Sequence, residues 1–163
     1  MATKYDFHKV IIGRSEALSF VDLEIPSVPA KVDTGAYRSA VHASDISEED
    51  GVLSFTLLGG HPQCDAMSKR ISVKSYNIVG IRNSFGQRED RYEVKLKAKL
   101  GPKVFFAQFT LADRSQNVYP ILLGRKLLSH RFLVDTGRAG VDRAVLRKKY
   151  GIKFPMDEEE GRD

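Results

Sequence analysis

The sequence predicts a single all-β domain built as a closed barrel. Short runs of alternating apolar and polar residues recur along the chain, and glycine, proline, asparagine or serine separates most of them. Helical periodicity appears only toward the C-terminal end. The length of 163 residues suits one domain, whose core needs no disulfide or metal.

The expected strands follow from period-two alternation, and the turns between them follow from their residue types. In chain order, the predicted strands are residues 10–12, 18–25, 30–32, 39–43, 52–58, 69–74, 76–81, 91–100, 104–111 and 131–134. The first two are expected to form a hairpin, with Pro26 and Pro29 marking the turn that follows. The acidic residues 45–51 are expected to form a loop.

Helices are expected at only two places, residues 125–130 and residues 141–150. The last eight residues, 156–163, are acidic and lack bulky side chains after Met156, which predicts a disordered tail. The remaining residues, 1–155, are interpreted as one domain.

Composition narrows the function classes. The formal charge of +5 is modest, and no nucleic-acid-binding motif accompanies it, so nucleic acid is not expected as a partner. No stretch approaches the roughly 20 apolar residues that a membrane helix needs, and the first residues lack the apolar core of a signal peptide. A cytoplasmic protein is expected.

The single cysteine, Cys64, is interpreted as a free surface thiol.

The run Asp33-Thr34-Gly35-Ala36 is the first candidate for chemistry. It follows a short apolar strand, glycine permits close approach of a second backbone, and the threonine hydroxyl can lock the corner by a hydrogen bond. Hydrolysis of a peptide without metal requires two carboxyl groups about 3 Å apart that share one proton. One aspartate alone therefore cannot perform this reaction.

A second segment, residues 119–128, combines a buried apolar strand, a glycine and a short helix, and it contains Leu123-Gly124-Arg125. Retroviral proteases and their cellular relatives combine an Asp-Thr-Gly-Ala corner with a later apolar-apolar-Gly-Arg segment that packs beneath it. The chain resembles them in both motifs and in their order. The interval between the motifs is longer here than in the viral enzymes.

More closely, residues 8–137 resemble a bacterial family that is labelled as ATP-dependent zinc proteases and is retropepsin-like in fold. The matching residues are Lys31-Val32-Asp33-Thr34-Gly35-Ala36, Ser39-Ala40, His42-Ala43, Arg91-Tyr92, Phe109-Thr110-Leu111, Asp113-Arg114, Tyr119-Pro120 and Leu123-Gly124-Arg125. Tyr37-Arg38 and Thr136-Gly137 depart from the family pattern. The family is associated with ATP-grasp ligases that add amino acids to protein or peptide ends, which implies a link to such a ligase.

The resemblance implies an aspartic peptidase that cleaves peptide or protein tails. Asp33, Thr34 and Gly35 are the expected catalytic residues. A dyad would need Asp33 from a second copy, so a two-fold homodimer is predicted. A flap is expected at residues 81–90, with residues 59–69 as the rival.

The expected substrate-binding residues are Ala36, Arg82 and Arg91. Neither a His-Glu-x-x-His helix nor a phosphate-binding loop is present in the sequence, so no metal or other cofactor is expected despite the family label.

Three alternatives remain open at this stage. Asp33 could mark a structural turn in a retropepsin-like module that binds a peptide or partner without cutting it. A zinc-dependent hydrolase could use His42, nine residues after Asp33. The second Asp-Thr-Gly, Asp135-Thr136-Gly137, could supply a catalytic carboxylate, although a turn at the end of a strand is the simpler interpretation.

Overall fold

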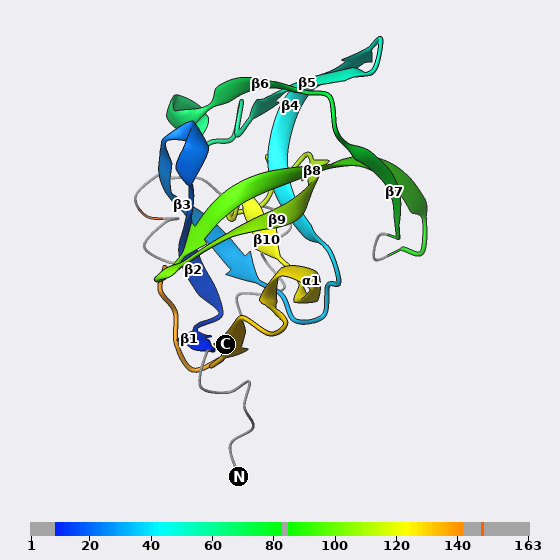
Figure 1. Cartoon of the computed structure of the whole chain (residues 1–163). Helices are drawn as coiled ribbons and strands as arrows, with labels where there is room; N and C mark the ends of the chain where they lie inside the picture. The colour runs from blue at the N-terminus through cyan, green and yellow to red at the C-terminus, as the bar shows by residue number, and fades with distance from the viewer. Residues whose placement is uncertain (1–8, 83–84, 142–147, 149–163) are drawn as a thin grey trace.

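Strands dominate the computed structural model, which describes residues 9–82, 85–141 and 148 of the chain. Its strands are β1 (Val10–Ile12), β2 (Ser15–Phe20), β3 (Ile25–Val32), β4 (Ser39–Glu49), β5 (Val52–Leu57), β6 (Lys69–Val73), β7 (Asn77–Arg82), β8 (Arg88–Leu100), β9 (Lys103–Ala112), β10 (Ile121–Leu123) and β11 (Phe132–Val134). The helices are η2 (Val21–Leu23), η3 (Asp65–Met67) and α1 (Arg125–Leu128). Figure 1 shows their arrangement.

Six strands close into a barrel. β10, β3, β2, β8, β9 and β4 pair in that order, and β10 also pairs with β4, which completes the ring. β10 runs parallel to β3, and β4 runs parallel to β9. The predicted closed all-β barrel is therefore confirmed, as is a short helix directly after the Leu-Gly-Arg segment.

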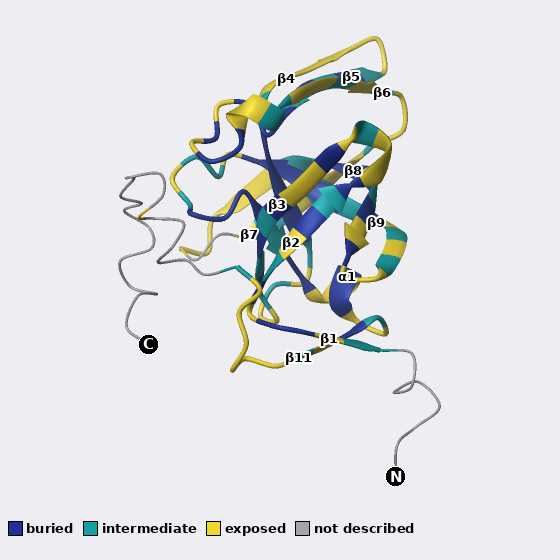
Figure 2. Cartoon of the chain, turned by 90° about the vertical axis from the view of Figure 1, so that its left-hand side faces the viewer, coloured by how far each residue is buried: buried dark blue, intermediate teal, exposed yellow. Residues whose placement is uncertain are grey.

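The barrel encloses an apolar core because its strands alternate inward and outward side chains. β8 shows this alternation over its second half, with Val94, Leu96, Ala98 and Leu100 buried. Phe20 and Phe109 meet inside the barrel with their ring centroids 5.6 Å apart in an edge-to-face arrangement. Figure 2 shows the buried positions on the barrel strands and many of the exposed ones on the outer hairpins.

The expected hairpin between the first two strands is not formed. β1 instead pairs in parallel with β11, and β2 pairs with β3. Pro26 and Pro29 do not mark a turn, because both lie inside β3. β10 pairs only with residues 30–32 of β3, so one side of β3 is unpaired at both prolines, where a missing N–H costs little. The bend lies earlier, at η2, which follows β2 directly.

The acidic residues 45–51 also differ from expectation, because β4 continues through them to Glu49. Beyond Ala43, β4 leaves the barrel wall and pairs only with β5. The reversal is confined to Asp50 and Gly51, which both adopt positive φ. The last five residues of β4 are exposed, so their charges remain in water and do not oppose the strand.

A second hairpin, β7 with the first part of β8, extends outward from the barrel (Figure 1). Its strands pair antiparallel from Asn77–Glu93 to Arg82–Arg88. Most of its side chains are exposed, including Ile78 at 63% and Phe85 at 87%. The hairpin includes the residues of the predicted flap that the structure describes, 81–82 and 85–90.

The predicted helix at residues 141–150 and the predicted tail at 156–163 fall largely or wholly outside the described residues. Across the described part of the chain, none of the helices is long and apolar enough to cross a membrane.

Candidate active site

The end of β3 presents Asp33 at an exposed corner. The Asp33 N–H donates to the Leu123 carbonyl at 2.9 Å, which joins the corner to β10. The Gly35 N–H donates to Asp33 Oδ1 at 2.9 Å, and the Ala36 N–H donates to the Asp33 carbonyl at 3.2 Å. Thr34 and Gly35 are exposed. Among the described residues, Asp33 Oδ2 has no hydrogen-bond partner, so it is available to a ligand.

The segment after β10 holds this corner from the other side. Gly124 has to be glycine, because a Cβ there would lie 2.6 Å from the Arg38 carbonyl oxygen. This close approach lets the Arg125 N–H donate to the Ala36 carbonyl at 2.8 Å. Arg125 Nη1 donates to the Thr34 carbonyl at 3.0 Å. The two motifs that the sequence singled out therefore form one unit.

The expected substrate-binding arginines lie apart from the corner, on the β7–β8 hairpin. Arg82 is the exposed last residue of β7. Arg91 Nη2 contacts Glu89 Oε2 at 3.1 Å, while Arg91 Nε is buried without a hydrogen-bond partner in the described structure. The Arg88 guanidinium covers Gly80 so closely that a Cβ would lie 2.4 Å from Nε. Within the described residues, no hydrogen bond or ion pair joins Arg82 or Arg91 to the Asp33 corner.

Comparison with known proteins identifies this arrangement. Residues 11–144 match the family model described as RimB-like, "Retropepsin-like aspartic endopeptidase RimB". The chain belongs to the RimB-like family. The match includes the whole barrel, the Asp33 corner and the segment that holds it. The predicted retropepsin-like family is therefore confirmed.

Curated relatives of this RimB-like chain are named as ligases. A "Probable alpha-L-glutamate ligase" of Desulfotalea psychrophila is 35% identical over 94% of this chain and 34% of its own length. Another protein with that name, from Shewanella pealeana, is 34% identical over 78% of the chain and 29% of its own length. The chain thus spans about a third of the length of these relatives.

The fold also occurs in a solved structure. The crystal structure of Lpg0085, a Legionella pneumophila protein of unknown function, superposes with a TM-score of 0.63 at 27% identity. The match covers 80% of this chain and 95% of the Legionella chain.

A second Asp-Thr-Gly corner, at Asp135, has the same local bonds as the first in this RimB-like chain. The Asp135 N–H donates to the Ile12 carbonyl at 2.8 Å, as the Asp33 N–H does to Leu123. The Gly137 N–H donates to Asp135 Oδ1 at 2.9 Å, as Gly35 does to Asp33. The corner ends β11, in agreement with its interpretation as a turn at the end of a strand.

The support beneath the second corner is also the same. Arg14 Nη1 donates to the Thr136 carbonyl at 3.0 Å, and the Arg14 N–H donates to the Arg138 carbonyl at 2.9 Å. A Cβ on Gly13 would lie 2.4 Å from that Arg138 oxygen. Gly13-Arg14 thus supports Asp135 as Gly124-Arg125 supports Asp33.

Sequence reasoning missed this duplication, although a signal was present. Ile11-Ile12-Gly13-Arg14 has the same pattern as Leu122-Leu123-Gly124-Arg125. Each run lies far along the sequence from the Asp-Thr-Gly that it supports. Only the parallel pairings β1–β11 and β10–β3 show which run supports which corner.

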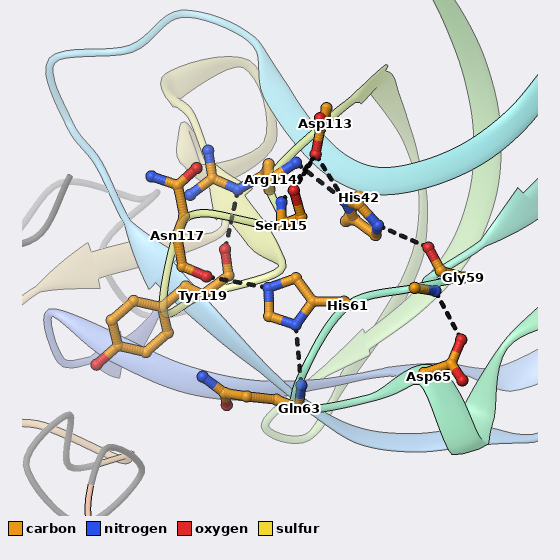
Figure 3. A network of polar contacts seen from close by, with 11 residues as sticks. His42, Gly59, His61, Gln63, Asp65, Asp113, Arg114, Ser115, Asn117 and Tyr119 are labelled. Carbon is orange, nitrogen blue, oxygen red and sulfur yellow. Dashed lines mark hydrogen bonds and ion pairs between the residues drawn. The ribbon is translucent and has the colours of Figure 1, made fainter. Parts of the chain in front are cut away.

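His42, the candidate zinc ligand, is buried and uses both ring nitrogens in contacts with backbone (Figure 3). Nδ1 accepts the Arg114 N–H at 2.9 Å, so Nε2 carries a ring hydrogen and donates to the Gly59 carbonyl at 2.8 Å. A metal would have to displace one of these bonds. Across the described residues, no group of three or more His, Cys, Asp or Glu side chains is placed to hold a metal. The geometry does not support zinc on His42 and Asp33.

His61 lies beside His42, with ring centroids 5.3 Å apart. Its Nδ1 accepts the Gln63 N–H at 3.2 Å, and its Nε2 lies 3.0 Å from the Asn117 carbonyl, to which it donates. Burial lowers the pKa of His61 from 6.5 to about 4, because the charged form would lose its hydration. The two histidines therefore connect residues 59–63 with residues 114–117 through hydrogen bonds to the backbone.

Cys64 was expected to be a surface thiol, and this prediction is wrong. Its exposed fraction is 1%, and it belongs to the barrel core. Burial raises the pKa of the Cys64 thiol to about 12, so it carries almost no thiolate near neutral pH. Cys64 is therefore a core residue that is unsuited to act as a nucleophile.

Proposed function

We propose that the chain is an aspartic peptidase whose catalytic dyad consists of Asp33 from each of two copies. The observation that supports this most directly is the Asp33 corner itself. One carboxylate oxygen is fixed by the Gly35 N–H, and the other has no partner in the described structure. Thr34 and Gly35 are exposed beside it, as an approach by a second copy requires.

The proposed reaction uses one ionised and one protonated Asp33. The carboxylate accepts a proton from a water molecule as the water oxygen attacks the peptide carbonyl carbon, and the carboxylic acid donates its proton to the carbonyl oxygen. The tetrahedral intermediate then collapses and the C–N bond breaks. The leaving nitrogen takes a proton from the protonated Asp33, while a hydroxyl of the intermediate returns a proton to the ionised Asp33, which restores one acid and one base. Two carboxyl groups this close cannot both ionise easily, which keeps one acid and one base available.

The proposed substrate is a peptide or protein tail bound as an extended strand beneath the β7–β8 hairpin. The name shared by the relatives, alpha-L-glutamate ligase, suggests tails built from glutamate and a functional link to a ligase. Arg82 and Arg91 on the hairpin would receive acidic side chains, and Ala36 would line the floor of the site.

Replacement of Asp33 tests the proposal. A synthetic peptide with a C-terminal oligoglutamate tail serves as substrate, and cleavage is followed by mass spectrometry. Asp33→Asn should abolish cleavage, and a chelator should leave wild-type cleavage intact. Asp135→Asn is the matched control, because it changes the same atom in a corner with the same bonds. If Asp33→Asn cuts as fast as the wild type, the proposal fails.

A second candidate function is a binding module that serves a ligase without cutting. The observation that favours it is the relatives' length, since the domain forms about a third of chains named as ligases. In that case Asp33→Asn would retain wild-type affinity for the oligoglutamate peptide, and the wild type would show no cleavage at any pH.

A further inference from the structure

Glu93 is a buried carboxylate that the proposed mechanism does not use. It lies on β8 with an exposed fraction of 3%. Its Oε2 accepts from Arg38 Nη1 at 2.6 Å, and its Oε1 lies 3.9 Å from Lys126 Nζ. A buried carboxylate is tolerated when cationic groups lie beside it, as two do here. The segments that carry these cations are therefore the ones that Glu93 holds in place.

Both partners of Glu93 belong to the two segments that surround the Asp33 corner, the residues that follow the corner and the residues that follow β10. Arg38 is the second residue after the corner, and its carbonyl is the group against which Gly124 packs. The Lys126 N–H donates to the Tyr37 carbonyl at 2.9 Å, next to the bond between the Arg125 N–H and Ala36. A displacement of Arg38 or Lys126 would therefore be transmitted through the backbone to Asp33.

Glu93 itself belongs to the base of the β7–β8 hairpin. It pairs with Asn77, the first residue of β7, on one side and with Thr110 of β9 on the other. Thr110 Oγ1 in turn donates to the Ser39 carbonyl at 3.1 Å, immediately after Arg38. The hairpin base and the corner thus meet through a partly buried ion pair and a buried hydrogen bond.

We propose that Glu93 is a positioning residue: through Arg38 it fixes the Asp33 corner relative to the hairpin that covers the substrate. This inference rests on the proposed peptidase function. Misplacement of a catalytic group by about 1 Å can cost roughly a hundredfold in rate, so loss of this link should lower kcat in addition to any loss of stability.

A double-mutant cycle tests the proposal with Glu93→Gln, Arg38→Gln and the double variant. The oligoglutamate peptide is the substrate, at a temperature where circular dichroism shows every variant folded. Each single variant should lower kcat about tenfold. The double variant should also lose about tenfold rather than about a hundredfold, because the two side chains act as one unit. Asp22→Asn is the matched control. It removes the 3.7 Å ion pair between Asp22 of η2 and Lys97 of β8, and it should leave kcat unchanged.

Hydrogen exchange at the Asp33 and Arg125 amides supplies a readout without substrate. Both amides are hydrogen-bonded within the corner, and both should exchange faster in Glu93→Gln but not in Asp22→Asn. A folded Glu93→Gln with wild-type kcat, or losses that multiply in the double variant, would overturn the proposal. If the wild type cleaves nothing, the proposed peptidase function fails, and hydrogen exchange alone tests the positioning role of Glu93. Unchanged exchange at both amides in Glu93→Gln would then overturn that role.

Discussion

Arg125 Nη1 donates a hydrogen bond to the carbonyl oxygen of Thr34 at 3.0 Å, across 91 residues of sequence. This bond connects the first residue of α1 with the middle of the Asp-Thr-Gly corner. Arg14 makes the same bond to Thr136 at the same distance. The chain therefore contains its own internal control for what such an arginine contributes.

Replacement of Arg125 by methionine should lower both activity and stability. Loss of one hydrogen bond from a charged donor should reduce the free energy of unfolding by about 1–2 kcal/mol, and the loosened corner should lower kcat about tenfold. Arg14→Met should reduce stability by a similar amount and leave kcat unchanged. Urea unfolding and steady-state cleavage measure the two effects, and equal kcat losses in both variants would contradict a special role for the Asp33 corner.

The stability of the protein should fall in mild acid because of His61. Its pKa is about 4 in the fold and 6.5 when unperturbed, so between these values the unfolded chain binds the additional proton. The contribution is complete above about pH 6.5 and is lost toward pH 4, at about 1.4 kcal/mol per pH unit for this site. His61→Gln should flatten the dependence of the unfolding free energy on pH by about one proton. An unchanged slope in that variant would exclude His61 as the source.

Cys64 should be unreactive in the native protein. With an exposed fraction of 1% and a pKa raised to about 12, its thiol offers a reagent neither access nor thiolate. A thiol-specific reagent at pH 7.5 should label the chain only after denaturant is added. Rapid labelling of the folded protein would show that the Cys64 region opens locally.

Arg82, on the β7–β8 hairpin, should affect substrate affinity more than turnover. Arg82→Gln removes an exposed cation at the end of β7, so KM for the oligoglutamate peptide should rise severalfold while kcat changes little. The effect should shrink as salt is added, because an exposed charge is screened. Arg70→Gln is the comparison. Arg70 lies on β6 and contacts the Asp45 carbonyl on β4, so this change should leave KM unchanged.

Local patterns were sufficient to predict much of the barrel. The alternation of apolar and polar residues predicted the ends of β5, β6, β7 and β9 to within a residue or two. The glycine after β10 predicted the start of α1. Both are local features, because a strand that lines a core must alternate whatever its partner is. The Asp33 corner was a candidate because of its own residues, whereas its connection with Gly124-Arg125 came from the resemblance to retropepsin-like proteases.

Features that depend on distant partners were not predicted. β1 has too few residues to show that its partner is β11 rather than β2. The polar surroundings of Cys64 gave no sign that residues 58–67 fold over the barrel and bury it together with His61. Nor does Glu93 differ, in sequence, from the exposed Glu89 on the same strand. Its burial follows from Arg38, which only the closed barrel brings within 2.6 Å.

Subunit mixing tests the proposed shared dyad most directly. Wild type and Asp33→Asn are mixed in equal amounts, allowed to exchange subunits, and assayed against the oligoglutamate peptide at constant total protein. If each site needs Asp33 from both copies, only wild-type homodimers cut, and about a quarter of the wild-type activity should remain. Retention of about half would show that each chain works alone and would contradict a dyad shared between two copies.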